Sequence, residues 1–173
     1  GDRFAFASNR RDVAVFDVYV QRRDAVGDAA TLVHEGDGSL SVGGWSPDDG
    51  RLLVHESRSN FDHELYVLDL ATEELRQVTP EDDEDVRYRS LEWSPDGESL
   101  YLVTDRDADT LYLARLDLDS GALSTVETGG ERDVDDVAGD QDTGRLVYSR
   151  NVEGYTELTV ASIGEDPDAL DSP

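Results

Sequence analysis

Short apolar runs separated by turn residues recur along the whole chain. A representative stretch covers residues 91–103 and reads L-E-W-S-P-D-G-E-S-L-Y-L-V. Pro95 presets the backbone for the first corner of a turn, and Gly97 accepts a conformation that other residues resist. Residues 99–103 then form an apolar run bounded by turn residues, as a buried strand does. The stretch therefore predicts a strand, a tight turn and a second strand.

The same phrase recurs at a fixed step. It reads G-G-W-S-P-D-D-G-R-L-L-V-H over residues 43–55. A degenerate copy, G-D-Q-D-T-G-R-L-V-Y-S, covers residues 139–149. The turn glycines Gly50, Gly97 and Gly144 are 47 and 47 residues apart. A second marker has intervals of 47, 46 and 47 and consists of Tyr19, Tyr66, Tyr112 and Thr159. Two landmarks that keep one step indicate a repeat architecture.

The apolar runs predict strands throughout. The expected strands cover residues 1–10, 13–21, 31–34, 40–45, 51–56, 63–70, 75–79, 89–93, 98–104, 110–118, 122–127, 133–138, 145–150 and 156–163. No segment sustains an apolar 3.6-residue period, so we expect almost no helix. Four short strands joined by hairpins form an antiparallel meander, and meanders at this step are blades of a β-propeller. The predicted fold class is therefore all-β, a β-propeller fragment of about four blades, each a four-stranded antiparallel meander.

The predicted domain organisation is one partial β-propeller over residues 1–173. It divides into an incomplete blade at 1–38, blades at 39–80 and 86–129, and a blade at 132–173, in which we expect the polar residues 164–173 to hold only part of a fourth strand. Propellers usually close with four to eight blades. We therefore expect an open arc of a larger ring of about six to eight blades. Its end blades would expose apolar faces and an unpaired strand edge, which favours self-association.

The charge of the chain is extreme. There are 41 acidic residues against 15 basic ones, a net charge of −26, and every basic residue is an arginine. This composition predicts a protein from a salt-loving archaeon with a high-salt cytoplasm, where screening offsets the repulsion between like charges. A GC-rich genome explains the missing lysine but not the size of the acidic excess. We therefore expect a cytoplasmic protein that is destabilised at low salt.

The composition also excludes several classes of function. Scattered arginines among acids disfavour nucleic acid as a partner, and the same charge disfavours anionic membranes. No apolar run approaches the roughly 18 residues of a membrane span. The chain has no Cys, which excludes disulfides and thiolate sites, and no Met, so we do not expect Gly1 to be the native start.

The repeated phrase resembles the TolB-type propeller repeat. Its elements are W-S-P-D-G at residues 93–97, T-D-R at 104–106, L-Y-L at 111–113 and, in the preceding unit, S-R at 57–58, L-Y-V-L-D-L at 65–70 and Q-V-T at 77–79. The resemblance covers nearly the whole chain and is specific for a blade, but several families share the repeat. The last unit departs from it, with G-D-Q-D at 139–142 in place of W-S-P-D, so we expect a looser turn there.

The resemblance implies two functions. Among users of the repeat, the chain is similar to the N-terminal propeller of the prolyl oligopeptidase family, which lies over a C-terminal α/β-hydrolase domain. It would then be a non-catalytic segment that restricts access of peptide substrates to a hydrolase domain absent from this chain. The alternative is a TolB-like protein-binding scaffold of the cell envelope with no enzymatic partner domain.

Residues with catalytic or metal-binding chemistry are few. A hydrolase needs a G-x-S-x-G nucleophile elbow, and the nearest string, residues 39–43, lacks the first glycine and falls on an innermost strand. The histidines are His34, His55 and His63, of which the last two lie on adjacent predicted strands. A metal site would need a converging carboxylate, but Glu56 and Glu64 should point to the opposite faces. We therefore favour ordinary strand positions.

An acidic run at residues 105–109 resembles the start of a calcium loop. The EF-hand spacing demands Gly at the sixth position and Glu at the twelfth, where this chain has Thr110 and Leu116. A solvated acidic loop between two strands is the better interpretation. The charged segment 80–85 is likewise interpreted as a solvated link between blades.

Four arginines recur at the ends of the second strands, which suggests a structural role such as pairing with the turn residues Asp48 or Asp96. They are Arg10, Arg58, Arg106 and Arg150. The pair Glu73-Glu74 resembles the acidic pair that holds a substrate amine in some dipeptidyl peptidases, but its place in a simple hairpin favours an ordinary turn. For Trp45 and Trp93, blade packing is favoured over a ligand-stacking platform. We thus predict no catalytic, cofactor-binding or metal residue, and no cofactor.

Overall fold

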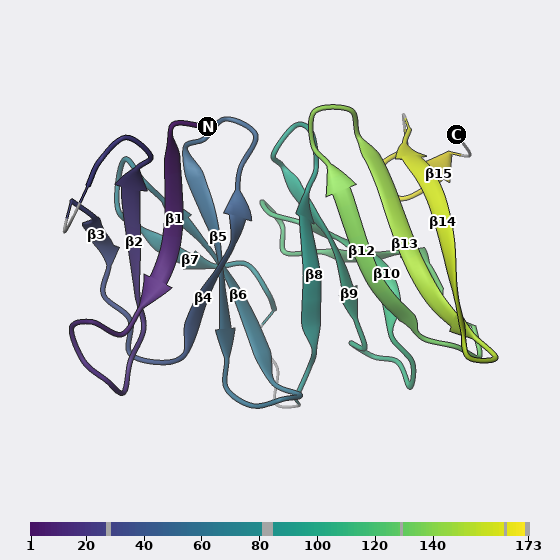
Figure 1. Cartoon of the computed structure of the whole chain (residues 1–173). Coiled ribbons are helices and arrows are strands. Elements are labelled where there is room, and N and C mark those ends of the chain that lie inside the picture. Colours follow the sequence, from purple (N-terminus) through teal and green to yellow (C-terminus); the bar gives the residue numbers. More distant parts are fainter. Residues whose placement is uncertain (27–28, 81–84, 129, 165, 172–173) are drawn as a thin grey trace. The chain divides into compact units, whose positions relative to one another are not determined.

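The computed structural model describes residues 1–26, 29–80, 85–128, 130–164 and 166–171. The regular structure in these ranges is β-strand, and no helix occurs in them, which confirms the all-β prediction (Figure 1). The strands are β1 (Arg3–Ser8), β2 (Asp17–Arg22), β3 (Thr31–His34), β4 (Leu40–Trp45), β5 (Arg51–Ser57), β6 (His63–Asp69), β7 (Leu75–Gln77), β8 (Tyr88–Trp93), β9 (Ser99–Thr104), β10 (Tyr112–Asp117), β11 (Leu123–Glu127), β12 (Val134–Asp140), β13 (Arg145–Val152), β14 (Tyr155–Ile163) and β15 (Leu170–Asp171).

The strands form antiparallel meanders in which chain neighbours are also sheet neighbours. Sheet A has three strands, β1-β2-β3, and three further sheets have four each: sheet B is β4 to β7, sheet C is β8 to β11 and sheet D is β12 to β15. Hairpin connections between successive strands explain this order, because a short turn places the next strand alongside the last. The meander is the predicted blade element. Residues 13–16, expected in a strand, precede β2 instead.

The chain divides into two compact units, residues 1–78 with sheets A and B and residues 79–173 with sheets C and D. Each unit is held by an apolar layer between its two sheets. In the first, Val18 of sheet A packs with Leu52 and Val54 of sheet B. In the second, Tyr101 and Leu113 of sheet C pack with Leu146 and Tyr148 of sheet D, among others. Within each unit, therefore, one sheet covers a face of the next.

The two faces of every sheet can be named from these contacts, because side chains alternate along a strand. The front face of a sheet is the one that carries Ala5 in sheet A and Tyr101 in sheet C. The back face carries Leu52 in sheet B and Leu146 in sheet D. In both units the front face of one sheet packs on the back face of its successor. The same packing mode in both units is what a repeat of one supersecondary element predicts.

The repeated W-S-P-D turn is closed by its serine. Ser94 N–H donates to Ser99 O at 2.9 Å, and Ser94 Oγ donates to Asp96 Oδ1 at 2.6 Å. Ser46 makes the same bonds with Arg51 O, at 3.0 Å, and with Asp48 Oδ1, at 2.5 Å. These bonds are the reason that a serine and an aspartate stand at these positions.

The turns also correct the alignment of the glycines. Gly97 has a φ of 71°, in the left-handed region, as predicted. In the earlier copy that position is held by Asp49, with a φ of 57°, and not by Gly50. The bonds Gly97 N to Ser94 O and Asp49 N to Ser46 O identify the two as equivalent, 48 residues apart. The structural step from sheet B to sheet C is thus 48, one more than the glycine spacing.

The tyrosine marker is shifted in the same comparison. Asp69 and Asp117 are equivalent, because each closes the hairpin after the third strand by donating its N–H, to Glu74 O and Ala122 O respectively. Tyr66 precedes this position by three residues and Tyr112 by five. The two offsets differ by two residues, so both tyrosines lie on the same face of their sheets. Tyr112 lies two residues further from the hairpin than Tyr66 does.

Sheet D differs from sheets B and C at the position where those sheets have a tryptophan. Gly139 pairs with Leu146, as Trp93 pairs with Leu100 and Trp45 with Leu52. A Cβ on Gly139 would lie 2.8 Å from Leu146 Cδ2 and 3.3 Å from Glu92 Cβ, so the packing of β12 on β8 leaves no room for a larger side chain. The expectation of a looser turn is wrong. Asp140 pairs with Arg145, and its carboxylate accepts hydrogen bonds from Asp142 N and Thr143 Oγ1.

Candidate functional site

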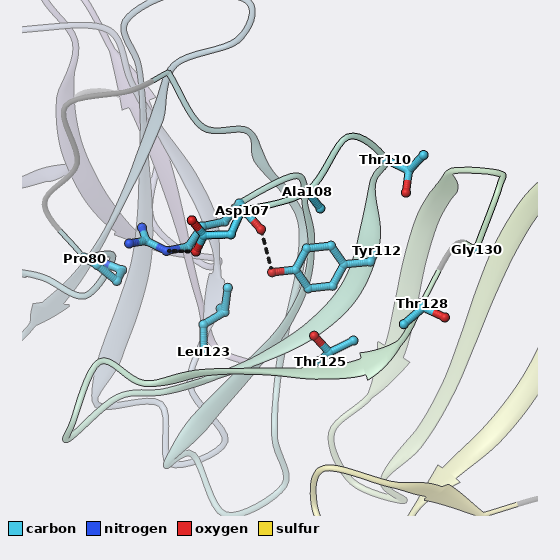
Figure 2. Close-up of a pocket in the computed structure, with 10 residues that line it drawn as sticks. Pro80, Asp107, Ala108, Thr110, Tyr112, Leu123, Thr125, Thr128 and Gly130 are labelled. Atoms are coloured by element: carbon cyan, nitrogen blue, oxygen red, sulfur yellow. Dashed lines mark hydrogen bonds and ion pairs between the residues drawn. The ribbon is translucent and has the colours of Figure 1, made fainter.

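A pocket of about 610 Å³ lies in the second unit, beside the loop between β9 and β10. It is lined by Pro80, Arg106, Asp107, Ala108, Thr110, Tyr112, Leu123, Thr125, Thr128 and Gly130. Figure 2 shows the ring of Tyr112 between the loop that carries Ala108 and the strand that carries Thr125. Tyr112 Oη donates a hydrogen bond of 3.1 Å to Arg106 O, and burial raises the pKa of Tyr112.

The charged groups of the pocket already have partners. Arg106 Nη1 donates to Tyr88 Oη at 3.2 Å, and its Nε lies 3.5 Å from Asp107 Oδ2. Among the lining residues there is no His, Cys or Lys, and the hydroxyls belong to Tyr112 and to threonines. The hydroxyls of the pocket therefore have no histidine or lysine of the lining to act as a general base. The pocket offers hydroxyls beside the apolar side chains of Pro80, Ala108 and Leu123, a lining that suits a small polar group.

The acidic run at 105–109 has a structural task. Asp105 Oδ1 accepts from Arg87 N at 2.8 Å, and Asp105 Oδ2 accepts from Arg87 Nε at 2.6 Å. The carboxylate thus fixes the segment before β8 to the loop after β9. Over the ranges that the structure describes, no three His, Cys, Asp or Glu side chains are arranged to hold a metal ion.

The histidine pair has the geometry expected from the sequence. The ring centroids of His55 and His63 are 4.7 Å apart in an edge-to-face arrangement. Their neighbours Glu56 and Glu64 lie on the other face, where both accept from Tyr66 Oη, at 3.1 and 2.5 Å. Burial, together with these carboxylates, raises the pKa of Tyr66. His34, by contrast, lies on the outer strand β3 and pairs with Val18.

The recurring arginines do not bind the turn aspartates, so that prediction is wrong. In sheets B, C and D the arginine and the turn lie at opposite ends of the second strand. Each arginine instead contacts groups at its own end of the strand. Arg58 lies 2.7 Å from Glu64, Arg150 lies 2.7 Å from Glu127, and the Arg10 guanidinium lies 4.5 Å from the centroid of the Tyr19 ring. The turn aspartates accept from their own turns, and the hydrogen bond from Ser46 lowers the pKa of Asp48.

The remaining candidates also have local roles. Trp45 joins the apolar layer between sheets A and B, with the Arg3 guanidinium 4.7 Å from its ring, while Trp93 is buried at the end of β8. Glu73 has a φ of 59° in the hairpin between β6 and β7, an ordinary turn position. Residues 40–43 of the serine-containing string belong to β4, so they form no nucleophile elbow.

Sequence reasoning missed one buried charge. Asp17 has no exposed surface, yet it binds Arg11 through two bonds, at 2.7 and 2.9 Å, and accepts from Gly36 N at 3.0 Å. The hydrogen bond from Arg11 lowers the pKa of Asp17. In a chain with so many acids, one more aspartate at the start of a strand gave no signal. The hydrogen bond from Gly36 to Asp17 links the start of β2 to the segment after β3.

The class of protein follows from these observations. Meanders repeating at 46 to 48 residues, packed face on back, define a β-propeller-type scaffold whose polar groups mostly close turns and pair sheets. None of the described residues forms a helix long and apolar enough to cross a membrane.

Comparison with known proteins agrees with this class. No family model and no curated protein matches the sequence. Among solved structures, a putative TolB from Agrobacterium tumefaciens matches 99% of this chain and 60% of its own, with a TM-score of 0.74 and 14% identity. A prolyl endopeptidase matches 93% of this chain and 25% of its own (TM-score 0.70, 15% identity). Oligopeptidase B from Trypanosoma brucei matches 98% and 24% (TM-score 0.66, 22% identity).

The similarity concerns the fold. The chain spans 60% of the putative TolB and about a quarter of each of the two peptidases. The fold of this chain is thus shared with TolB and with peptidases of the prolyl oligopeptidase type, as the repeat suggested.

Proposed function

We propose that this chain is a non-catalytic propeller segment of a prolyl oligopeptidase-like serine peptidase, where it restricts the access of substrates to a hydrolase domain. One observation carries the proposal: in the part of the chain that the structure describes, the polar groups that look reactive in sequence are engaged in structure. Asp105 holds Arg87, and Asp48 and Asp96 close turns. A segment built in this way supports a site rather than forming one.

The packing between sheets suits a barrier. Leu113, Leu146 and Tyr148 lie in one apolar layer between sheets C and D, with Leu113 fully buried. Separating the two sheets would expose this apolar surface to water, at a free-energy cost of about 25 cal/mol per Å². The sheets of a unit therefore stay together while a flexible peptide passes, and a folded protein is excluded by its size.

The test is the sequence encoded after Pro173 and the activity of the full-length protein. A G-x-S-x-G elbow within an alternating strand and helix pattern is expected. The full-length protein should cleave short peptides but not folded proteins, and replacing the elbow serine by alanine should abolish cleavage. Peptidase activity of this chain alone would contradict the proposal.

A second candidate is a TolB-like protein-binding scaffold, favoured by the match that covers 99% of this chain. A stop codon soon after the last blade, with no hydrolase pattern, selects this function. The two candidates also differ in compartment. The peptidase would act in a high-salt cytoplasm and the scaffold in the cell envelope.

A further inference from the structure

The front face of sheet D carries exposed apolar side chains, one of them at a position whose equivalent in sheet C is buried. Leu113 and Leu158 are equivalent, because each pairs with the fifth residue of the preceding strand, Val103 and Ser149. Leu113 is fully buried against sheet D, whereas Leu158 is 68% exposed. Val160, on the same face as Leu158, is 49% exposed. This face has the chemistry of a front face without the covering that the front face of sheet C receives.

The back face of sheet A is the complementary case. Phe4 and Phe6 are the second and fourth residues of β1, as Leu146 and Tyr148 are of β13. The ring of Phe6 stacks on those of Phe4 and Tyr19, with centroids 5.7 Å apart in both cases. Phe4 is 43% exposed. Sheet A thus leaves Phe4 exposed and Phe6 half-buried, at positions equivalent to those that sheet C buries in sheet D, while Tyr19 behind them is buried.

An arginine marks both back faces. In sheet D, the Arg150 guanidinium lies 5.3 Å from the Tyr148 ring and forms an ion pair with Glu127 of sheet C. In sheet A, the Arg10 guanidinium lies 4.5 Å from the Tyr19 ring, and it donates a weak hydrogen bond to Ser8 Oγ at 3.4 Å. In the register that matches Phe6 with Tyr148, Arg150 corresponds to Ser8, so Arg10 lies two residues further along the chain and still stacks on the aromatic rings of the back face.

Sheet D therefore has an open front face and sheet A an open back face, and each matches a surface that is joined to a neighbouring sheet inside a unit. We propose that the front face of sheet D binds the back face of sheet A of a second copy of this chain. The contact is head-to-tail, since it joins two different surfaces. Such contacts produce closed rings or open chains of molecules, according to the rotation that each one imposes.

Charge sets the condition for this association. Two copies with a net charge of −26 each repel strongly at low salt. Screening at about 1 M salt shortens the Debye length to about 3 Å, which leaves the apolar contact to act. The proposal therefore requires association that strengthens with salt, the opposite of an association driven by ion pairs.

The test is sedimentation velocity of this chain across a hundredfold concentration range, in KCl at about 0.1 M and about 2 M. The mass should rise to that of a dimer or a larger species at high salt and high concentration. Leu158→Glu and Phe4→Glu should each reduce it to the monomer. Val13→Glu is the matched control, because Val13 is 86% exposed outside both faces, and it should associate as the unaltered chain does.

Mixing the variants tests the head-to-tail arrangement. Leu158→Glu retains the aromatic face of sheet A, and Phe4→Glu retains the aliphatic face of sheet D. An equimolar mixture should form a dimer and nothing larger, which also shows that both variants are folded. A monomer under every condition overturns the proposal. So does self-association of either single variant, or an effect of Val13→Glu equal to theirs.

Discussion

Arg150 Nη2 lies 2.7 Å from Glu127 Oε1, and this ion pair joins sheet D to the outer strand of sheet C. Arg150 Nη2 also donates to Thr128 O at 2.9 Å. An apolar layer has little directional preference, because apolar contacts tolerate sliding. The arginine adds a directional contact at the edge of that layer.

The Arg150–Glu127 contact should contribute modestly to stability. The two side chains are 27% and 37% exposed, so solvent weakens the attraction. We expect a coupling of about 0.5–1 kcal/mol in a double-mutant cycle of Arg150→Ala and Glu127→Ala, measured by urea unfolding. The Arg22–Asp24 pair is the control, because both side chains are more than 60% exposed and its coupling should be close to zero. Equal couplings would show that the first pair does not join the sheets.

Asp17 should contribute more than any exposed acid. Asp17→Asn keeps a side-chain acceptor but removes the charge that Arg11 binds, at a cost of about 1.5–3 kcal/mol in the free energy of unfolding. Asp24→Asn, at an exposed pair, should leave the free energy nearly unchanged. The measurement is urea unfolding at high salt. Equal effects of the two substitutions would contradict the assigned role of Asp17.

The same residue predicts a dependence on pH. Its pKa is lower in the folded protein, so its contribution is complete above the unfolded-state pKa of about 3.8 and is lost as the pH falls through the folded-state value. The melting temperature should therefore fall on acidification below about pH 4, and fall less in Asp17→Asn. Measurement at about 2 M KCl separates this effect from the general relief of repulsion. Parallel curves for the two proteins would refute the prediction.

The turn glycines should not be equivalent. Gly97→Ala places a side chain at a φ of 71° and should cost about 1–2 kcal/mol. Gly50→Ala should cost much less, since Gly50 has no positive φ and its added Cβ would meet Asp48 at 3.4 Å, an ordinary contact. Thermal melts of the two variants decide the matter. Equal losses would restore the equivalence that the spacing of 47 suggested.

The net charge predicts a salt requirement for folding. At about 0.1 M salt the Debye length is about 10 Å, so many of the acidic groups repel one another, and at about 1 M it is about 3 Å. The melting temperature should rise between about 0.1 M and 2 M KCl. Sodium chloride at matched ionic strength separates screening from a specific effect of potassium. A midpoint independent of salt would contradict the prediction.

The sequence by itself determined the strands and the order in which they pair. The alternation of apolar and polar residues, and turns such as Ser94 to Gly97, depend on contacts within a few residues, so β3 and β4 were predicted with their observed bounds. The face-on-back packing followed from the repeat, since one meander cannot bury both of its faces.

Only the tertiary structure decided which residues share a role across the sheets. Asp49 rather than Gly50 holds the left-handed position, and Gly139 replaces a tryptophan because Glu92 and Leu146 fill the space. The burial of Asp17 likewise depends on Gly36, which is 19 residues away. These outcomes depend on contacts between segments distant in sequence, and such contacts leave no mark in local residue patterns.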